Sequence, residues 1–579
     1  MSRSKVIELE FKNLKPFQPR RFIPEDVDLT KVENVVALYK KILNRRIRSQ
    51  TGLGKWLNDR SELEAAIDQQ GTFLYIRMTC QTDDRERSEA YQNFIKTVTP
   101  TIKPLVHQLN KKYLAERSRF PLDIKRFEVH DRNLNTDVKI FVDKNIPLQT
   151  QEALLSQEYQ AICGAMMVHF EGQDRTLPQM AKYLQEPDRN KREAAWREIA
   201  KRRLKDKERL DDLFDRMLII RSQIATNARC ANFCEYQFQA FHRFDYAPAD
   251  CKKYHQSIEQ WVVTMWRELL NHRAKMMKIK KLRPWDLDVD PQGALPLKPF
   301  EHTDDFIRKT FEIFNRLDQE FGVQFKDMME LGLLDLASRR GKAPGGYQNT
   351  FNEARKPFIF MNAVGVQRDV ETILHEAGHA FHALATRGED LFAYRSAPIE
   401  FCEVASMSME LLGNEFLEVF YPAAEARRAR RDHLEGIIEL FPWIATVDAF
   451  QHWIYTHPGH GPADRTEAWI ALMGRFGGEV DWTGHETVRA HLWHRQLHIF
   501  LHPFYYVEYG IAQLGALQVW ANASQDKAKA LRAYQEGLAL GGSRRLPELF
   551  AKAGCRFDFS AETLRPLTQL VRTELAKLA

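Results

Sequence analysis

Apolar residues recur three and four positions apart along much of the chain, with charged residues between them. This spacing places the apolar side chains on one face of an α-helix, as in helices that pack on a core. The clearest examples are residues 152–170, 191–224, 251–279 and 303–321. Strand candidates are few and short: residues 73–78, 139–142 and 357–362. The pattern therefore predicts a mainly α fold with a small β element.

Two segments interrupt the helical pattern. Residues 283–300 contain four prolines and a glycine, which are incompatible with a regular helix. Residues 341–346 read Gly-Lys-Ala-Pro-Gly-Gly and also predict a loop. A basic run at 190–209 has acidic residues interleaved through it, so we interpret it as a solvated helix with internal ion pairs, not as an RNA-binding helix.

Composition and charge narrow the class of protein without naming a partner. Hydrophobic residues make up 44% of the 579 positions and charged residues 28%, which excludes collagen-like, low-complexity and wholly disordered chains. Lys and Arg number 84 and Asp and Glu 78. The resulting net charge of +6 is too small to indicate a basic surface that binds nucleic acid. We expect no nucleic-acid partner.

Cysteine usage and the lack of apolar runs point to the cytoplasm. The seven cysteines are odd in number and scattered, so we expect no disulfide framework. Cys230 and Cys234 lack a second pair of ligands, so we expect no structural zinc there. The start of the chain does not read as a secretory signal, and no run reaches the roughly 18 apolar residues of a membrane span. The sequence predicts a cytoplasmic protein without a membrane partner.

Residues 375–379 read His-Glu-Ala-Gly-His, the His-Glu-x-x-His pattern. Two imidazoles one helical turn apart can bind Zn²⁺, and the glutamate between them can act as general base. Because such a short pattern also arises by chance, its surroundings decide its meaning. On a helix over 366–387 the two histidines share one face and the apolar residues lie on the other. We therefore predict His375 and His379 as ligands and Glu376 as base.

A catalytic zinc ion needs a third protein ligand, commonly a carboxylate, and an open position. The segment 398–412 predicts a helix that proline opens, with Glu400, Glu403 and Glu410 on one face. Glu403 is the predicted third ligand, and Glu400 or Glu410 can accept the outward N–H of a ligating histidine. The alternative is a solvated acidic face. His382 lies near the histidine face, where it either supports a ligand or packs as a polar residue.

These residues resemble the zinc site of the thimet oligopeptidase and oligoendopeptidase F superfamily. Glu403 follows His379 by 24 residues, a spacing similar to that family's, and the likeness extends from about residue 335 to the end of the chain. It is strongest to the oligoendopeptidase F branch. The resemblance implies a mainly helical, two-lobed zincin-type metallopeptidase with a deep central channel. We expect an N-terminal helical lobe over 1–190 and a catalytic domain over 191–579.

The segment 498–509, His-Ile-Phe-Leu-His-Pro-Phe-Tyr-Tyr-Val-Glu-Tyr, has donors that can stabilise a developing oxyanion. We expect a helix from Pro503 that places Tyr505 and Tyr509 on one face. The resemblance implies that Tyr509, assisted by His502 or His498, contacts the tetrahedral intermediate. Whether Tyr505 or Tyr506 assists instead is left open, and aromatic core packing is the alternative for each tyrosine.

Residues near the zinc site are candidates for binding substrate. The strand 357–362 can pair with a peptide through a free edge, with Phe358 and Phe360 at the substrate, or it is an ordinary buried strand. The glycine-rich segment ending in Tyr347 can close on a peptide backbone, which makes Gly345, Gly346 and Tyr347 further candidates. Tyr505 is the last of the predicted substrate-binding residues. Residues 457–462 form either a second lid or a solvent loop.

Together these patterns predict a zinc-dependent endopeptidase with one Zn²⁺ that cleaves short unfolded peptides. Two alternatives remain: a carboxydipeptidase of the same superfamily, which needs a cation for the free carboxylate, and a peptide-binding relative without activity. The intact base Glu376 argues against the second, because a binding protein has no use for it. The sequence leaves the oligomeric state undetermined.

Overall fold

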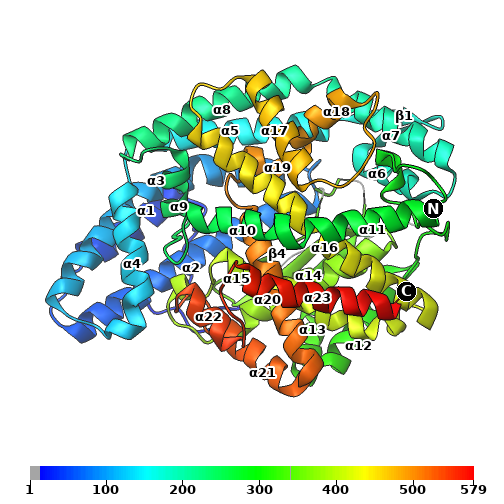
Figure 1. Cartoon of the computed structure of the whole chain (residues 1–579). Coiled ribbons are helices and arrows are strands. Elements are labelled where there is room, and N and C mark those ends of the chain that lie inside the picture. The colour runs from blue at the N-terminus through cyan, green and yellow to red at the C-terminus, as the bar shows by residue number, and fades with distance from the viewer. Residues whose placement is uncertain (1–13, 340, 344, 579) are drawn as a thin grey trace. The chain divides into compact units, whose positions relative to one another are not determined.

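The structure is a computed structural model that describes residues 14–339, 341–343 and 345–578. Within these ranges the chain is mostly helical with two small sheets, so the predicted mainly α fold is confirmed (Figure 1). The first 13 residues, which include the start of the chain discussed above, lie outside the description. Among the helices described, none combines the length and apolar character needed to cross a bilayer.

The chain forms two compact units, and each is discontinuous in sequence. The first contains residues 1–139, 298–426 and 515–557, and the second contains 140–297, 427–514 and 558–579. This division differs from the predicted boundary at residue 190. The N-terminal helices and the His-Glu-x-x-His helix belong to the same unit, because the chain leaves that unit after residue 139 and returns at 298. The predicted central channel stays a prediction.

The first unit begins with four helices: α1 (Val32–Asn44), α2 (Gln50–Cys80), α3 (Arg85–Arg119) and α4 (Ile124–Ile140). Their apolar faces form one core around the fully buried Trp56, Val98 and Tyr113. The predicted strands at 73–78 and 139–142 are wrong, because the first lies inside α2 and the second at the end of α4. Short runs of β-branched and aromatic residues do not distinguish a strand from a buried helical segment.

The chain returns to the first unit with α12 (Thr303–Leu317) and α13 (Gln319–Glu330), followed by β3 (Leu334–Ala337), β4 (Tyr347–Phe351) and β5 (Lys356–Ala363). Next come α14 (Gln367–Ala385), η3 (Phe392–Tyr394), α15 (Ile399–Gly413) and η4 (Asn414–Val419). The later helices α21 (Lys527–Leu538) and α22 (Leu546–Lys552) also belong here. The continuous helix predicted over 303–321 is broken at Asp318, whose carboxylate caps α13 by accepting from Glu320 N.

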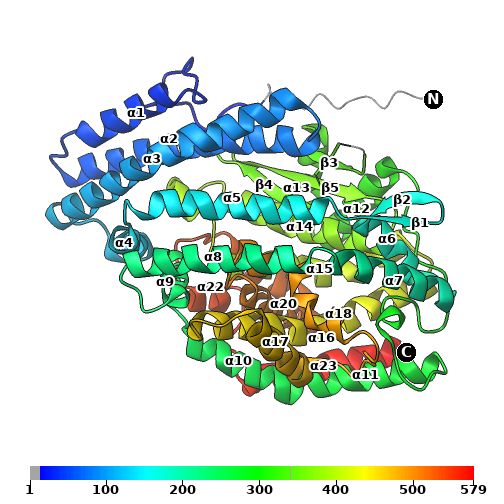
Figure 2. The same ribbon diagram turned by 90° about the horizontal axis from the view of Figure 1, so that it is seen from above.

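The three-stranded sheet of the first unit has the order β3-β5-β4, and α14 packs against it (Figure 2). β5 pairs in parallel with β3 and antiparallel with β4, with Gln348 opposite Ile359. The predicted strand at 357–362 is confirmed, but its predicted free edge is wrong, because β5 is the central strand. The side chains of Phe358 and Phe360 are fully buried, so they belong to the core instead of a substrate surface.

The second unit starts with α5 (Asn145–Gly164), the hairpin of β1 (Met167–Phe170) and β2 (Gln173–Thr176), α6 (Leu177–Ala181) and η1 (Lys182–Gln185). It continues through α7 (Arg189–Leu204), α8 (Lys207–Asn227), α9 (Phe233–Ala240), α10 (Pro248–Trp261), α11 (Val263–Met276) and η2 (Pro284–Asp286). Most of α16 (Ala423–Thr456) follows, then α17 (Pro462–Phe476), α18 (Glu486–Ala490), η5 (Leu492–Arg495) and α19 (Leu497–Leu501). The start of α20 (Val507–Gln525) and all of α23 (Ala561–Leu578) complete it.

Candidate metal centre and active site

Two helices of the first unit, α14 and α15, carry the predicted metal ligands. α14 begins where the Asp369 carboxylate accepts hydrogen bonds from the backbone N–H groups of residues 364, 365 and 366, at 2.8, 2.8 and 3.0 Å. These bonds satisfy donors that a helix start otherwise leaves unpaired. One face of α14 is buried, with Val370, Ile373 and Ala377 fully enclosed. The helix is therefore fixed while His375 and His379 project from its other face.

The structure brings His375, His379 and Glu403 together. Glu403 Oε2 lies 3.4 Å from His375 Nε2 and 3.6 Å from His379 Nε2. Each residue offers a ligand atom, and these atoms all lie within 4.8 Å of one another. Ligand atoms around a tetrahedral Zn²⁺ with bonds near 2.0–2.1 Å are separated by about 3.3 Å. Two imidazoles and a carboxylate at this spacing fit a zinc ion.

The outward side of each histidine ring is hydrogen-bonded, as expected for metal ligands. Glu410 Oε1 lies 2.6 Å from His375 Nδ1, and the His379 ring donates to the backbone carbonyl of Cys402. Ser406 Oγ donates to Glu403 Oε2 at 2.9 Å. Such contacts set the tautomer and orientation of a ligating ring. The structure thus places Glu410 at His375, while Glu400 is buried at the start of α15.

His382 lies in a different environment from the two predicted ligands. Its ring packs edge-on against Phe401, with centroids 6.0 Å apart, and donates to the backbone carbonyl of Leu538. Burial lowers the pKa of His382 to about 3, so the ring is neutral near pH 7. Of the two roles considered for it, we favour polar packing that ties α14 to the rest of its unit.

The charges of the site are strongly coupled. Burial disfavours the charged form of His375, but the Glu403 and Glu410 carboxylates outweigh it and hold the pKa of His375 above its ordinary value. Burial lowers the pKa of His379 to about 4. Burial alone would raise the pKa of Glu403, but the two histidines and Ser406 lower it to about 2. The Glu403 and Glu410 carboxylates therefore place negative charge beside the two imidazoles, which favours the binding of a divalent cation.

Glu376 has the properties of a general base. Its side chain is buried, with 7% of its surface exposed, and burial raises the pKa of Glu376 to about 7. The backbone N–H of Gln348 in β4 donates to its carboxylate. A base is most effective when its pKa lies near the working pH. This hydrogen bond also places the edge strand β4 beside the base, a relation that the sequence did not indicate.

Replacing Glu410 with glutamine is expected to weaken metal binding without removing a ligand. The amide cannot accept as strongly from His375 Nδ1, so the ring loses basicity and orientation. We expect metal affinity to fall about 10- to 100-fold, measured by competition with a chromogenic chelator. Glu415→Gln is the control, because Glu415 is exposed in η4 and pairs with Lys527 at 2.7 Å. Equal affinities in both variants would contradict the role of Glu410.

The two helices that carry the candidate metal ligands approach each other closely at Gly378. A Cβ atom at this position would lie 2.6 Å from Ser406 Cα and 2.7 Å from the backbone oxygen of Ala405. Because these are backbone atoms, a larger side chain must push α15 away from α14. Gly378 therefore sets the distance between the histidines of α14 and Glu403 of α15.

Gly378→Ala is expected to lower both stability and metal affinity. Alanine gains about 1 kcal/mol of helix propensity, but overpacking against backbone costs about 3 kcal/mol. The expected result is a lower unfolding temperature, measured by circular dichroism, and weaker metal binding, measured by chelator competition. Gly388→Ala is the control, because a Cβ there meets nothing within 4 Å. A Gly378→Ala protein with unchanged stability and affinity would show that the helices do not depend on this contact.

The predicted oxyanion residues form one ring cluster in the second unit. The ring centroid of His498 lies 6.2 Å from that of His502, 5.6 Å from Tyr505, 4.9 Å from Tyr506 and 5.7 Å from Tyr509. The rings of Tyr505 and Tyr509 are 5.4 Å apart. The structure therefore brings all five predicted candidates together.

The backbone before α20 differs from the predicted helix. α20 begins at Val507 instead of Pro503, because Phe504 adopts a positive φ of 67° that ends regular structure. Gln451 accepts from Phe504 N, and Arg243 donates to Phe504 O at 2.6 Å. Arg243 also forms a buried ion pair with Glu508. These contacts fix the segment that carries Tyr505 and Tyr506.

The glycine-rich segment before β4 is anchored to the sheet of the first unit. The side chain of Lys342 is buried and pairs with Asp335 at 3.0 Å, and Asn362 donates to the backbone oxygen of Gly345 at 2.9 Å. The Tyr347 ring stacks on Phe360 at 4.7 Å. Pro344 of this segment lies outside the described residues. The candidates Gly345, Gly346 and Tyr347 therefore lie at the start of the edge strand, which supports contact with a peptide backbone.

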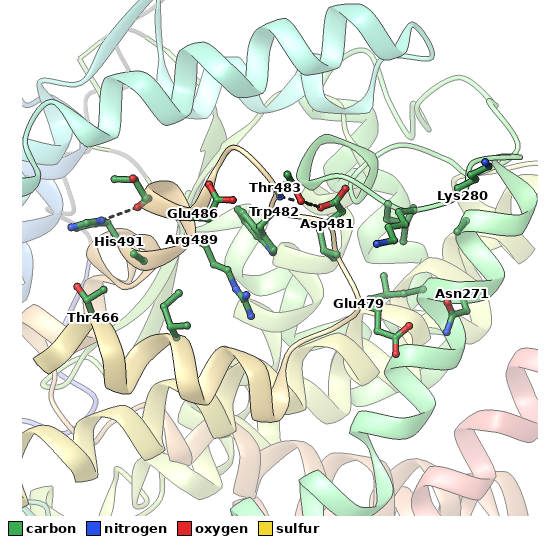
Figure 3. A pocket seen from close by; sticks show the side chains of 18 residues that line it. Asn271, Lys280, Thr466, Glu479, Asp481, Trp482, Thr483, Glu486, Arg489 and His491 are labelled. Atoms are coloured by element: carbon green, nitrogen blue, oxygen red, sulfur yellow. Dashed lines mark hydrogen bonds between the residues drawn. The ribbon is translucent and has the colours of Figure 1, made fainter. Parts of the chain in front are cut away.

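A separate cavity of about 1010 Å³ lies in the second unit (Figure 3). Its walls come from α11 and the segment that follows it, from α17, and from α18 and the loop before it. They include Lys280, Asp481, Trp482, Arg489 and His491. The cavity contains mixed charges but none of the residues of the His-Glu-x-x-His site. We therefore place the candidate chemistry at α14 and α15.

Comparisons with known proteins find family models and relatives that match this chain. The model of "Peptidase family M3" matches residues 182–568, and that of the "Peptidase M3 N-terminal domain" matches 24–141. Oligopeptidase PepF of Bacillus subtilis is 24% identical over 49% of this chain and 42% of its own length. An oligoendopeptidase F homolog of Lactococcus lactis is 24% identical over 53% of this chain and 50% of its own. The chain thus spans half or less of the length of these curated relatives.

Solved structures resemble the chain over nearly its full length. PZ peptidase A, solved with an inhibitor, has a TM-score of 0.90 and 26% identity, and the match covers 96% of this chain and 99% of that one. A protein proposed to be an oligoendopeptidase F has a TM-score of 0.89, 27% identity and the same coverage. The fold is therefore shared with peptidases.

Proposed function

The chain belongs to peptidase family M3, and from this we propose that it is a zinc-dependent endopeptidase that cleaves internal bonds of short unfolded peptides. The observation that carries the proposal is the joint position of His375, His379 and Glu403, with Glu376 buried beside them. A binding protein needs neither a base with a pKa of about 7 nor an open metal position.

The residues of the site divide the chemistry between them. His375, His379 and Glu403 would hold one Zn²⁺, which supplies a Lewis acid that polarises the scissile carbonyl and acidifies water. Glu376 takes the proton of the attacking water and delivers it to the leaving amine. From the family resemblance we assign Tyr509, with His498 or His502, the role of donor to the oxyanion.

The edge strand β4 explains why the proposed substrate is an extended peptide. One side of β4 pairs with β5, and its Gln348 N–H is directed to Glu376. A peptide that adds to the outer side of β4 gains backbone hydrogen bonds and presents its carbonyls near the base. Only an extended segment can pair in this way, so folded proteins are poor substrates.

Tyr509→Phe is expected to reduce kcat about 10²- to 10³-fold while KM changes little. The variant keeps the ring of the aromatic cluster but loses the hydroxyl that would donate to the oxyanion. Steady-state kinetics on a fluorogenic peptide measure the effect, and metal content serves as the control for an intact site. A near-normal kcat would exclude Tyr509 as the donor.

The proposal is tested by digesting a defined peptide mixture and a folded protein side by side. Internal cleavage of the peptides, loss of cleavage with a chelator, recovery with Zn²⁺ and an intact folded protein are expected. Mass spectrometry of the products separates the alternatives. Release of C-terminal dipeptides that stops when the C-terminus is amidated would indicate a carboxydipeptidase, and no products would indicate a binding relative.

A further inference from the structure

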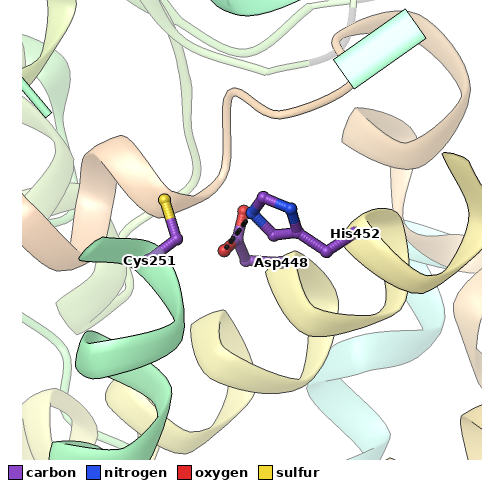
Figure 4. Close-up of side chains that lie close together, drawn as sticks. All are labelled: Cys251, Asp448 and His452. Atoms are coloured by element: carbon purple, nitrogen blue, oxygen red, sulfur yellow. Dashed lines mark ion pairs between the residues drawn. The ribbon is translucent and has the colours of Figure 1, made fainter. Parts of the chain in front are cut away.

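A second group of metal-ligating side chains lies inside the second unit, on α10 and α16 (Figure 4). Cys251 and His255 are four residues apart on α10, and Asp448 and His452 are four apart on α16. Each pair therefore lies on one helical face, one turn apart. The ligand atoms of Cys251, Asp448 and His452 all lie within 4.8 Å of one another.

The cluster supplies three donor atoms at a spacing compatible with one metal ion. Asp448 Oδ2 lies 3.4 Å from His452 Nε2, close to the separation of about 3.3 Å between N and O ligands of one zinc ion. In Figure 4 the Asp448 carboxylate lies between the Cys251 thiol and the His452 ring. Cys251 Sγ completes a set of sulfur, nitrogen and oxygen donors, a combination that Zn²⁺ accepts.

Two further side chains hold the donors in place. His255 Nε2 lies 2.7 Å from Asp448 Oδ2 and orients the carboxylate. Cys234 Sγ lies 3.8 Å from His452 Nδ1, on the side of the ring that faces away from Asp448. A partner at Nδ1 leaves Nε2 as the ligating atom, the arrangement seen in histidines that bind metals.

The burial of the cluster favours a bound cation. Cys251 and Asp448 are fully buried and His452 is 6% exposed. Among the described residues, Asp448 Oδ1 and His452 Nε2 have no hydrogen-bond partner. Unpaired buried polar atoms cost free energy, and an ion held by Cys251 Sγ, Asp448 Oδ2 and His452 Nε2 would give the unpaired Nε2 a partner.

We propose that Cys251, Asp448 and His452 bind a second zinc ion, which cross-links α10 to α16 inside the second unit. A thiolate and an imidazole select zinc over magnesium or calcium, which prefer oxygen ligands. The thiol of Cys251 gives up its proton to solvent when the metal binds. One thiolate and one carboxylate then balance the two positive charges of the ion in the buried interior of the second unit.

The sulfur ligand makes this site measurable apart from the proposed catalytic one. Co²⁺ bound through His375, His379 and Glu403 has no thiolate ligand, whereas Co²⁺ at Cys251 gives an intense thiolate-to-metal band in the near ultraviolet. The full-length His375→Ala/His379→Ala variant, loaded with Co²⁺, is expected to keep that band and about one metal ion per chain. X-ray absorption of its zinc form is expected to show a sulfur neighbour at about 2.3 Å.

The same variant tests the proposed second zinc site, because it leaves Cys251, Asp448 and His452 unchanged. Absence of bound metal from it, or bound cobalt without the thiolate band, would overturn the proposal and leave a metal-free hydrogen-bonded cluster. Cys251→Ser in that background is expected to lose the band, and persistence of the band would also overturn it. Because no readout is peptide cleavage, failure of this site and failure of the proposed function are distinguishable.

Discussion

Glu376→Gln is expected to lower turnover about 10²- to 10⁴-fold while the protein keeps its metal. The amide has nearly the shape of the carboxylate and accepts the Gln348 N–H through its oxygen, so the fold of the site is preserved. It cannot take a proton from water. The loss should therefore appear in kcat, with metal content and unfolding temperature close to those of the unchanged protein.

A matched control for this variant lies on the same helix. Glu371 is one and a half turns before Glu376 on α14 and pairs with Arg368 at 3.0 Å. Glu371→Gln removes the same charge from the same helix without touching the base, and its turnover should remain near normal. If Glu376→Gln also retained near-normal turnover, the residue would not be the base. If both variants lost activity equally, general electrostatics of α14 would explain the effect.

The parts of the site that follow from local periodicity could be predicted from the sequence. His375 and His379 share a face because a helix repeats every 3.6 residues. The same rule places Glu403 and Glu410 on one face of α15, seven residues apart, and in the structure Glu410 lies at His375. Apolar residues on the opposite side of α14 already indicated which face is buried.

Features that depend on distant segments could not be predicted. The edge strand β4 has a mixed polar sequence, Tyr-Gln-Asn-Thr-Phe, and becomes a strand because it pairs with β5. Its pairing makes β5 central and removes the free edge expected there. Strand pairing reflects tertiary context more than local preference. The role of Gln348 beside Glu376 therefore appears only in the structure.

The buried cluster of the second unit shows the same limit. Cys251 with His255, and Asp448 with His452, have helical spacing that is visible in the sequence. Nothing local indicates that two helices almost 200 residues apart face each other. Cys234 and Cys230 are close in sequence, but the Cys234 thiol lies 3.8 Å from His452 Nδ1 of α16. The sequence around Cys234 gives no indication of this contact.

Glu403→Gln is expected to abolish metal binding at the catalytic site and with it peptide cleavage. Glu403 Oε2 faces both histidine rings, at 3.4 and 3.6 Å, and it is the charged member of the set. An amide is a weaker ligand and leaves the cation's charge unbalanced in a buried site. Cleavage should fall to the level of the chelated protein, and metal analysis after gel filtration should show one ion per chain fewer.

A control variant and a second metal measurement make the Glu403→Gln result interpretable. Glu415→Gln, on the exposed side of η4, should keep both metal and activity. If the zinc ion proposed at Cys251 is present, Glu403→Gln should lose about one metal equivalent but retain the cobalt–thiolate band, since that cluster lies in the other unit. A Glu403→Gln protein with full metal content and normal cleavage would show that the third ligand lies elsewhere, and the pairing of α14 with α15 would no longer explain the activity.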